Sequence, residues 1–149
     1  MADERGLPRL KQIAEYMCKS ESFDRVAGMV KITNGGDGRC VGEFTVGPEH
    51  LNRGGTLHGG LTATILDNVT TYALMSKSSH PGVSSSLNVN YLAAAKPGDV
   101  IEVDANTVHA GRKMAYIECV LRNKATGRVI ASGGQTKFVD FEKKETSDK

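Results

Sequence analysis

The sequence lacks tryptophan, and aromatic residues make up only 5% of its 149 residues. Its three cysteines, Cys18, Cys40 and Cys119, are widely spaced and form no CxxC pair. An odd number in this arrangement argues against a disulfide scaffold and a cysteine zinc site. It predicts reduced thiols that fill a core, and hence an intracellular, cytoplasmic protein.

No apolar run approaches the length of a membrane span. The N-terminus carries Asp3 and Glu4 without the apolar segment of a secretory signal. The formal net charge of +2 is close to neutral, so composition indicates neither a nucleic-acid partner nor a membrane surface. We expect one domain over residues 1–140 and a charged tail without periodicity over residues 141–149.

Glycine, in contrast, is abundant, and four of the 17 glycines lie close together between residues 54 and 60. This stretch predicts a loop that enters a helix just after His58. The first amides of a helix have no partner within it and lie at its positive end. They are suited to hold negative charge that develops on a carbonyl oxygen.

The same helix carries a single acid, Asp67. In helical projection this acid points away from the apolar face formed by Leu61, Ile65, Val69, Tyr72 and Ala73. Because no lysine or arginine lies nearby, we expect the segment to be mostly buried. A buried carboxylate needs partners or a catalytic role. The spacing alone equally allows a structural hydrogen bond to a neighbouring strand.

The remaining chain shows short periodic segments separated by turns. Residues 7–20 predict an amphipathic helix, and residues 29–33 and 39–46 predict a hairpin around an Asn-Gly-Gly-Asp-Gly turn. After Pro81-Gly82 the period is two, which predicts a meander of four strands over residues 83–92, 100–109, 114–123 and 128–139. The expected class is α+β: a curved antiparallel sheet of about six strands around one long helix, with a short N-terminal helix. Its open edges predict at least a dimer, with a ligand site possible at the interface.

The pattern Asn52…His58-Gly59-Gly60…Asp67, with the long helix and the strands, resembles the hotdog-fold acyl-CoA thioesterases. The similarity is densest in the run GTLHGGLTAT, residues 55–64, and extends over about residues 8–139. It implies hydrolysis of medium- to long-chain fatty acyl-CoA to fatty acid and CoA, with no cofactor or metal. An aryl or short-chain thioesterase and a non-catalytic acyl-CoA-binding protein are the alternatives.

The resemblance also implies roles for five residues. Asp67 acts as general base or nucleophile, and the Gly59 amide is the oxyanion donor, with His58 beside it. Asn52 holds the water or the carbonyl, and Ser84 orients water, in a dimer from the neighbouring subunit. The presence of His58 and Asp67 could suggest a Ser–His–Asp triad, but the sequence contains no nucleophile-elbow motif. The four histidines also lack metal-ligand spacing, so the residues alone favour a structural His58.

By the same resemblance the CoA moiety contacts residues at strand ends and turns. They are Ser84, Tyr91, Leu92, Ala93, Ala94, Ala95, Lys96, His109, Ala110, Gly111, Arg112, Lys113, Met114 and Phe138. Lys96, Arg112 and Lys113 could reach phosphates. The family's usual assembly is a homotetramer of two dimers, and the family is linked to a phosphatidylcholine transfer protein and to mitochondria.

Overall fold

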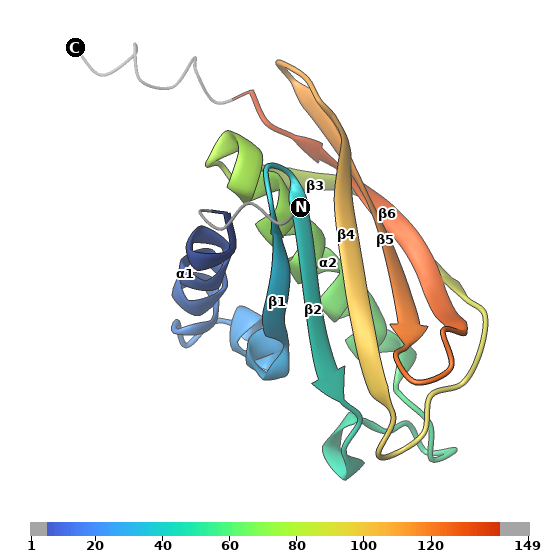
Figure 1. Cartoon of the computed structure of the whole chain (residues 1–149). Coiled ribbons are helices and arrows are strands. Elements are labelled where there is room, and N and C mark those ends of the chain that lie inside the picture. Colours follow the sequence, from blue (N-terminus) through green and yellow to red (C-terminus); the bar gives the residue numbers. More distant parts are fainter. Residues whose placement is uncertain (1–5, 141–149) are drawn as a thin grey trace.

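A long helix, α2 (Gly59–Ser78), lies across one face of a six-stranded antiparallel sheet in the computed structural model, which describes residues 6–140 (Figure 1). The sheet curves around this helix, and the α+β architecture is as predicted. The strands are β1 (Lys31–Gly36), β2 (Arg39–Thr45), β3 (Val83–Tyr91), β4 (Val100–Ala110), β5 (Met114–Asn123) and β6 (Val129–Phe138). The predicted tail over residues 141–149 lies outside the described residues.

The strand order is β1-β2-β4-β5-β6-β3, so the predicted four-strand meander is wrong for its first strand. Strand β3 pairs with β6, from Val83 opposite Phe138 to Tyr91 opposite Ala131, and does not pair with β4. The turn before β4 is anchored elsewhere, because the Gly98 amide donates to the Val46 carbonyl beyond β2. The chain therefore crosses from one edge of the sheet to its middle between β3 and β4.

The core lies between the sheet and α2. Alternate residues of β4 and β5 face the helix and are almost fully buried: Ile101, Val103, Ala105, Ala115, Ile117, Cys119 and Leu121. On α2, Ile65, Val69 and Tyr72 meet them. Burial of each valine, leucine or isoleucine side chain in this core stabilises the folded state by about 1.5–3 kcal/mol. The predicted apolar face of the helix is thus confirmed.

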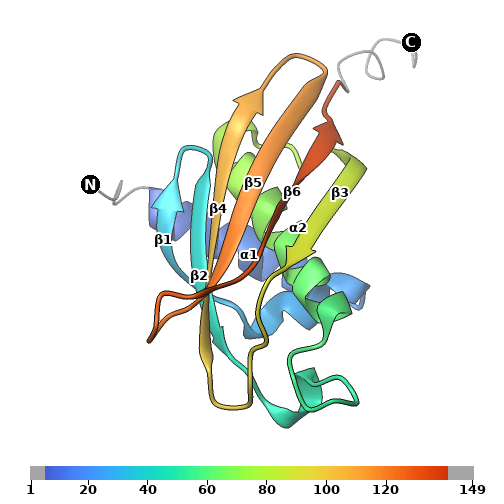
Figure 2. The ribbon, with the colours of Figure 1, turned by 90° about the vertical axis from the view of Figure 1, so that its right-hand side faces the viewer.

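The two sheet edges differ in their cover. Helix α1 (Gly6–Cys18) packs beside β1 with Leu10 fully buried, followed by the 3₁₀ helix η1 (Phe23–Met29). A second short 3₁₀ helix, η2 (Pro48–His50), precedes the glycine-rich loop. The other edge, β3, is open (Figure 2), and every residue of it except Val89 is exposed.

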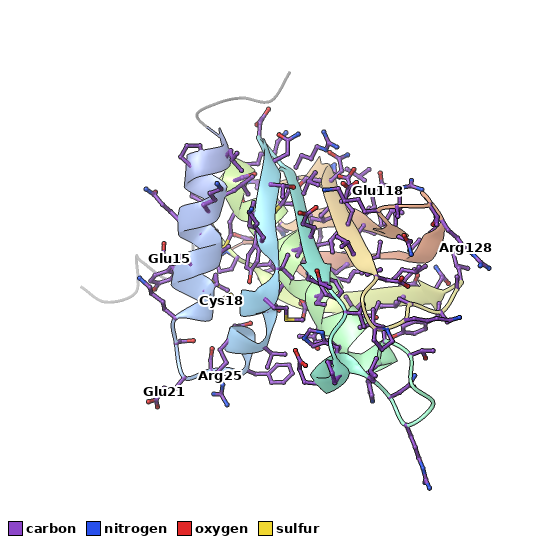
Figure 3. The ribbon with its side chains drawn as sticks, turned by 60° about the horizontal axis from the view of Figure 1, so that its bottom comes forward. Glu15, Cys18, Glu21, Arg25, Glu118 and Arg128 are labelled. Atoms are coloured by element: carbon purple, nitrogen blue, oxygen red, sulfur yellow. The ribbon has the colours of Figure 1, made fainter. Side chains whose placement is uncertain are left out.

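Charged side chains lie on the outside of both layers. Glu15, Glu21 and Arg25 point outward from the N-terminal segment, and Glu118 and Arg128 from the far part of the sheet (Figure 3). No helix within residues 6–140 is long and apolar enough to cross a membrane.

Candidate active site

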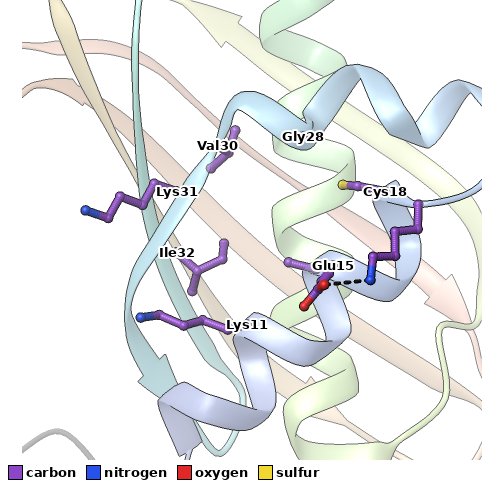
Figure 4. Close-up of a pocket in the computed structure, with 9 residues that line it drawn as sticks. Lys11, Glu15, Cys18, Gly28, Val30, Lys31 and Ile32 are labelled. Carbon is purple, nitrogen blue, oxygen red and sulfur yellow. Dashed lines mark ion pairs between the residues drawn. The ribbon is translucent and has the colours of Figure 1, made fainter.

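A groove between α1 and β1 forms a cavity with a volume of about 360 Å³ (Figure 4). Its floor is aliphatic, with Val30 and Ile32. Its carboxylate, Glu15, is exposed and paired with Lys19 at 2.7 Å. The residues that line this groove therefore include no unpaired carboxylate.

A second cavity, of about 260 Å³, contains Asp67. It lies between α2, the start of β3, the end of β6 and η1, and we call it the Asp67 cavity. Its lining is Met17, Asp24, Asp67, Asn68, Thr71, Pro81, Gly82, Val83, Ser84 and Lys137. The fold thus brings Asp67 and Ser84, two of the predicted catalytic residues, into one cavity of one chain. The sequence had suggested that Ser84 comes from the neighbouring subunit, and within this chain it already lies at the cavity of its own Asp67.

The backbone of Asp67 is held unusually firmly. Its carbonyl oxygen accepts hydrogen bonds from Thr70 Oγ1 at 3.0 Å, Thr71 Oγ1 at 2.9 Å and Gln135 Nε2 at 2.8 Å. Hydroxyl groups one turn along a helix commonly donate back to its carbonyls. The third donor comes from β6 and ties the helix to the sheet, so the position from which the carboxylate projects is fixed by both layers.

Gln135 also links Asp67 to Ser84. The Ser84 hydroxyl donates to Gln135 Oε1 at 2.7 Å, while Gln135 Nε2 donates to Asp67 and to Thr70 Oγ1 at 2.5 Å. The side chain of Gln135 is almost completely buried, and its bond to Thr70 is shielded from water. Gln135 was not among the predicted site residues.

Two charged residues of the cavity also escaped prediction, Lys137 and Asp24. Lys137 is only 4% exposed, and its Nζ donates to Thr71 Oγ1 at 2.9 Å. Burial lowers the pKa of Lys137 from the ordinary 10.5, while the negative charges of Asp67 and Asp24 act in the opposite direction. Asp24 Oδ1 accepts from Asn68 Nδ2 at 3.2 Å. The sequence did carry a signal for Lys137. Its position in the alternating pattern of the last strand faces inward, where an apolar residue is expected.

The N-terminus of α2 forms a separate site. His58 is the N-cap residue, and its Nδ1 accepts from the Gly60 amide at 2.8 Å. This is the structural function that the residues alone favoured. None of the residues that the structure describes accepts a hydrogen bond from the Gly59 amide, as is usual for the first amides of a helix. Tyr91 covers this turn, because its hydroxyl donates to the Gly59 carbonyl at 2.6 Å.

Asn52 closes the glycine-rich loop. Its Oδ1 accepts from the Thr56 amide at 3.1 Å, and its Nδ2 donates to Thr56 Oγ1 at 2.9 Å. A third cavity, of about 370 Å³, lies beside this loop and is lined by His58 and Leu61 among others, but not by Asp67. Within one chain Asp67 and Ser84 line the same cavity, whereas Asn52 lies in the glycine-rich loop and Gly59 at the N-terminus of α2.

The model of the thioesterase superfamily matches residues 54–130, which include the N-terminus of α2, Asp67 and Ser84. The chain belongs to the thioesterase superfamily. Acyl-coenzyme A thioesterase 13 of Homo sapiens is 40% identical to it over 131 residues, which cover 87% of this chain and 94% of the relative. These matches identify the chain as a thioester hydrolase.

Solved structures of the superfamily share its hotdog fold. Zebra fish thioesterase superfamily member 2 has a TM-score of 0.85 and 42% identity, covering 89% of this chain and 97% of that one. A hypothetical thioesterase of Streptococcus pneumoniae, solved with coenzyme A, has a TM-score of 0.70 and 30% identity, covering 74% of this chain and 87% of that one.

In the chain described here, the residues predicted to contact CoA fall into two groups at opposite ends of β3. Met114 and Val83 both lie opposite Phe138, so the β4–β5 turn and the start of β3 share one end of the sheet. Residues 91–96 lie at the other end. The nine residues from Val83 to Tyr91 span about 26 Å of strand, eight steps of about 3.3 Å. Of these candidates Ala95 is buried, Ala93 and Gly111 are half-buried, and the others are exposed.

Proposed function

We propose that this protein hydrolyses medium- to long-chain fatty acyl-CoA to free fatty acid and CoA, with the chemistry at Asp67. The observation that carries the proposal is the Asp67 cavity, where a carboxylate, a hydroxyl and a buried ammonium meet. Membership of the thioesterase superfamily supports thioester hydrolysis. The human relative's acyl-CoA activity and the streptococcal relative's bound coenzyme A support a CoA ester as substrate.

Asp67 can act in two ways. As a general base it takes a proton from water while the water oxygen attacks the thioester carbonyl, and Ser84 orients that water. The tetrahedral intermediate then breaks its C–S bond, and the CoA thiolate leaves and is protonated. As a nucleophile the carboxylate itself attacks and expels the thiolate, which leaves a mixed anhydride that water hydrolyses to the acid. Both routes place negative charge on the carbonyl oxygen.

A single chain cannot supply both the base and the proposed oxyanion donor to one substrate. Gly59 and Asp67 lie eight residues apart on α2, which corresponds to about 12 Å along the helix axis. An oxyanion donor must lie about 3 Å from the reacting oxygen, and the base must act on the adjoining carbon. Productive geometry therefore requires Gly59 from one protomer and Asp67 from another.

The open edge of β3 offers a way to assemble that geometry. If two β3 strands pair antiparallel about a two-fold axis near Leu87, Tyr91 of one protomer lies beside Val83 of its partner. Tyr91 contacts Gly59 and Val83 lines the Asp67 cavity. The pairing would thus bring the Gly59 amide of one protomer to the Asp67 cavity of the other. It would also bring together the two groups of CoA-contacting candidates, with Lys96 from one chain and Arg112 and Lys113 from the other.

Release of CoA thiol from palmitoyl-CoA by the wild type and by Asp67→Asn tests the proposal. Loss of a general base costs about 10²–10⁴-fold in rate. We expect a loss of that size in kcat for Asp67→Asn. Asp37→Asn is the matched control, because Asp37 lies in the β1–β2 turn with a φ of 48° that asparagine tolerates. Wild-type activity in Asp67→Asn would contradict the assignment.

A series of acyl chain lengths, with an aryl-CoA ester included, separates the leading proposal from its alternatives. Preference for short or aryl esters would support the second thioesterase class, and binding without turnover would support a non-catalytic binding protein. Association with mitochondria and with a phosphatidylcholine transfer protein stays a prediction from the resemblance.

A further inference from the structure

The groove between α1 and β1 has an aliphatic floor formed by both elements. On α1, Lys11, Ala14 and Cys18 follow one another at intervals of three and four residues, which places them on one face of the helix. On the opposite side the groove is lined by Val30 and Ile32, which are both buried. The volume of about 360 Å³ lies within the range of about 300–1,000 Å³ that is common for small-molecule sites.

Positive charge predominates around this floor. Three lysines line the groove, Lys11, Lys19 and Lys31, against one carboxylate, that of Glu15. Lys19 is paired with Glu15 at 2.7 Å. Among the described residues, the ammonium groups of Lys11 and Lys31 have no ion pair or hydrogen bond. In Figure 4 the side chain of Ile32 lies between those of Lys11 and Lys31. Two unpaired ammonium groups therefore flank the aliphatic floor.

This combination fits the anion of a single-chain fatty acid. Removal of an alkyl chain from water onto an aliphatic floor is favourable, and a carboxylate, which is ionised at neutral pH, pairs with ammonium groups. A CoA nucleotide fits the groove less well. The described residues that line it include no aromatic side chain on which adenine could stack and no arginine to bind phosphates in a bidentate manner.

We propose that the groove between α1 and β1 is a second, non-catalytic site that binds a fatty carboxylate. The alkyl chain lies along Val30 and Ile32, and the carboxylate is held by Lys11 and Lys31. The choice of a fatty acid rests on the proposed function, because hydrolysis of fatty acyl-CoA releases such an anion. The site is separate from the Asp67 cavity, since no described residue lines both.

Methyl-resolved NMR of the full chain, titrated with dodecanoate below its critical micelle concentration, tests the inference. We expect the methyl signals of Val30 and Ile32 to shift and to saturate. Dodecyltrimethylammonium has the same alkyl chain with the opposite charge, so it should leave these signals unchanged. The measurement needs no turnover.

Charge variants of the groove should change the affinity for dodecanoate in opposite directions. Lys11→Gln and Lys31→Gln should each weaken binding by about two- to fivefold, the loss expected for one exposed ion pair. Glu15→Gln should strengthen binding, because it removes a negative charge from the groove and releases Lys19. Lys124→Gln is the matched control, since Lys124 lies exposed in the β5–β6 turn and pairs with Glu43, and it should leave the affinity unchanged.

Three results would overturn the inference. Equal shifts with the cationic detergent would show that the groove binds alkyl chains without regard to charge. Shifts confined to the Asp67 cavity, seen at the methyl groups of Val83, would place the fatty acid in that cavity alone. An affinity that is the same in all three groove variants would exclude the lysines as ligands. Failure of the proposed function is seen separately, as a wild type that hydrolyses no CoA ester, and it leaves the binding result unaffected.

Discussion

Gln135 Nε2 lies 2.8 Å from the carbonyl oxygen of Asp67 and joins the last strand to the middle of the central helix. The same side chain accepts from Ser84, so one buried amide positions both residues that face the attacking water in the proposed reaction. A glutamine makes this possible because it carries a donor and an acceptor at one end.

Replacement of Gln135 by Leu should therefore affect both stability and activity. The variant keeps the volume but leaves the Ser84 hydroxyl and the Asp67 carbonyl with fewer partners. A buried polar group left unsatisfied costs about 1–3 kcal/mol, so we expect the free energy of unfolding to fall by about 2 kcal/mol. We also expect kcat to fall with KM nearly unchanged. Gln12→Leu, on the exposed face of α1, is the control that should change neither.

Gly59→Ala tests the contact between Gly59 and Tyr91. A Cβ at this position would lie 3.2 Å from Tyr91 Cζ, so the ring must move and its hydrogen bond to the Gly59 carbonyl must lengthen. We expect a drop in kcat/KM of about tenfold, less than the roughly 10²–10³-fold cost of removing an oxyanion donor, because here the donor is only misplaced. Gly28→Ala, whose Cβ has only Cys18 Cβ at 3.9 Å, should leave turnover unchanged. If Gly59→Ala is fully active, the packing of Tyr91 has no catalytic consequence.

Mixing two inactive variants tests whether the site spans two protomers. Asn52→Ala disables the glycine-loop half of the site and Asp67→Asn the cavity half. When the two chains are refolded together, half of the dimers are mixed and each has one intact site, so about 25% of wild-type activity should return. A site contained within one chain would give no recovery. A monomeric mass by sedimentation would exclude the shared site altogether.

Cys40 should make the protein less stable in alkali. Burial raises the pKa of Cys40 to about 12 from the ordinary 9.0. Because the folded state then holds a proton that the unfolded state has lost, this contribution to stability is complete below pH 9 and is lost as the pH rises toward 12. In Cys40→Ala, the denaturant concentration at the unfolding midpoint should therefore fall less between pH 9 and pH 12 than it does in the wild type.

The three thiols should also differ in their reaction with a thiol reagent. In the native protein the half-buried Cys18 should be modified before Cys40 or Cys119. Faster labelling of Cys40 would contradict its burial.

Gly133→Ala should open the edge of the sheet. A Cβ on Gly133 would lie 1.9 Å from the Asn88 carbonyl oxygen, inside the β3–β6 ladder. Since that carbonyl belongs to backbone, β3 must separate locally from β6. We expect faster hydrogen exchange of the β3 amides, weaker self-association and a loss of hydrolysis. Wild-type exchange in β3 would show that the ladder tolerates the methyl group.

The sequence predicted the elements better than their order. Alternation in β4 and β5 and the apolar face of α2 are local patterns, and their buried residues were correct. The pairing of β3 with β6 could not be predicted, because a period of two shows which face a residue occupies but not which strand lies beside it. Asp67 was recognisable as an acid in an apolar helix, while Gln135 and Lys137 became visible only when β6 was placed against that helix.

The position of β3 at the sheet edge next to β6 has a consequence for synthesis of the chain. As the ribosome makes the protein, β3 emerges well before β6, the last strand, with which it pairs. Long-range pairing of this kind delays folding, and until residues 129–138 are available Asp67 lacks the contact with Gln135 that ties α2 to the sheet. The Asp67 cavity is therefore completed last. A nascent or truncated chain that lacks β6 should have no hydrolytic activity at all, and an unpaired β3 exposed at that stage is the segment that a chaperone would have to shield.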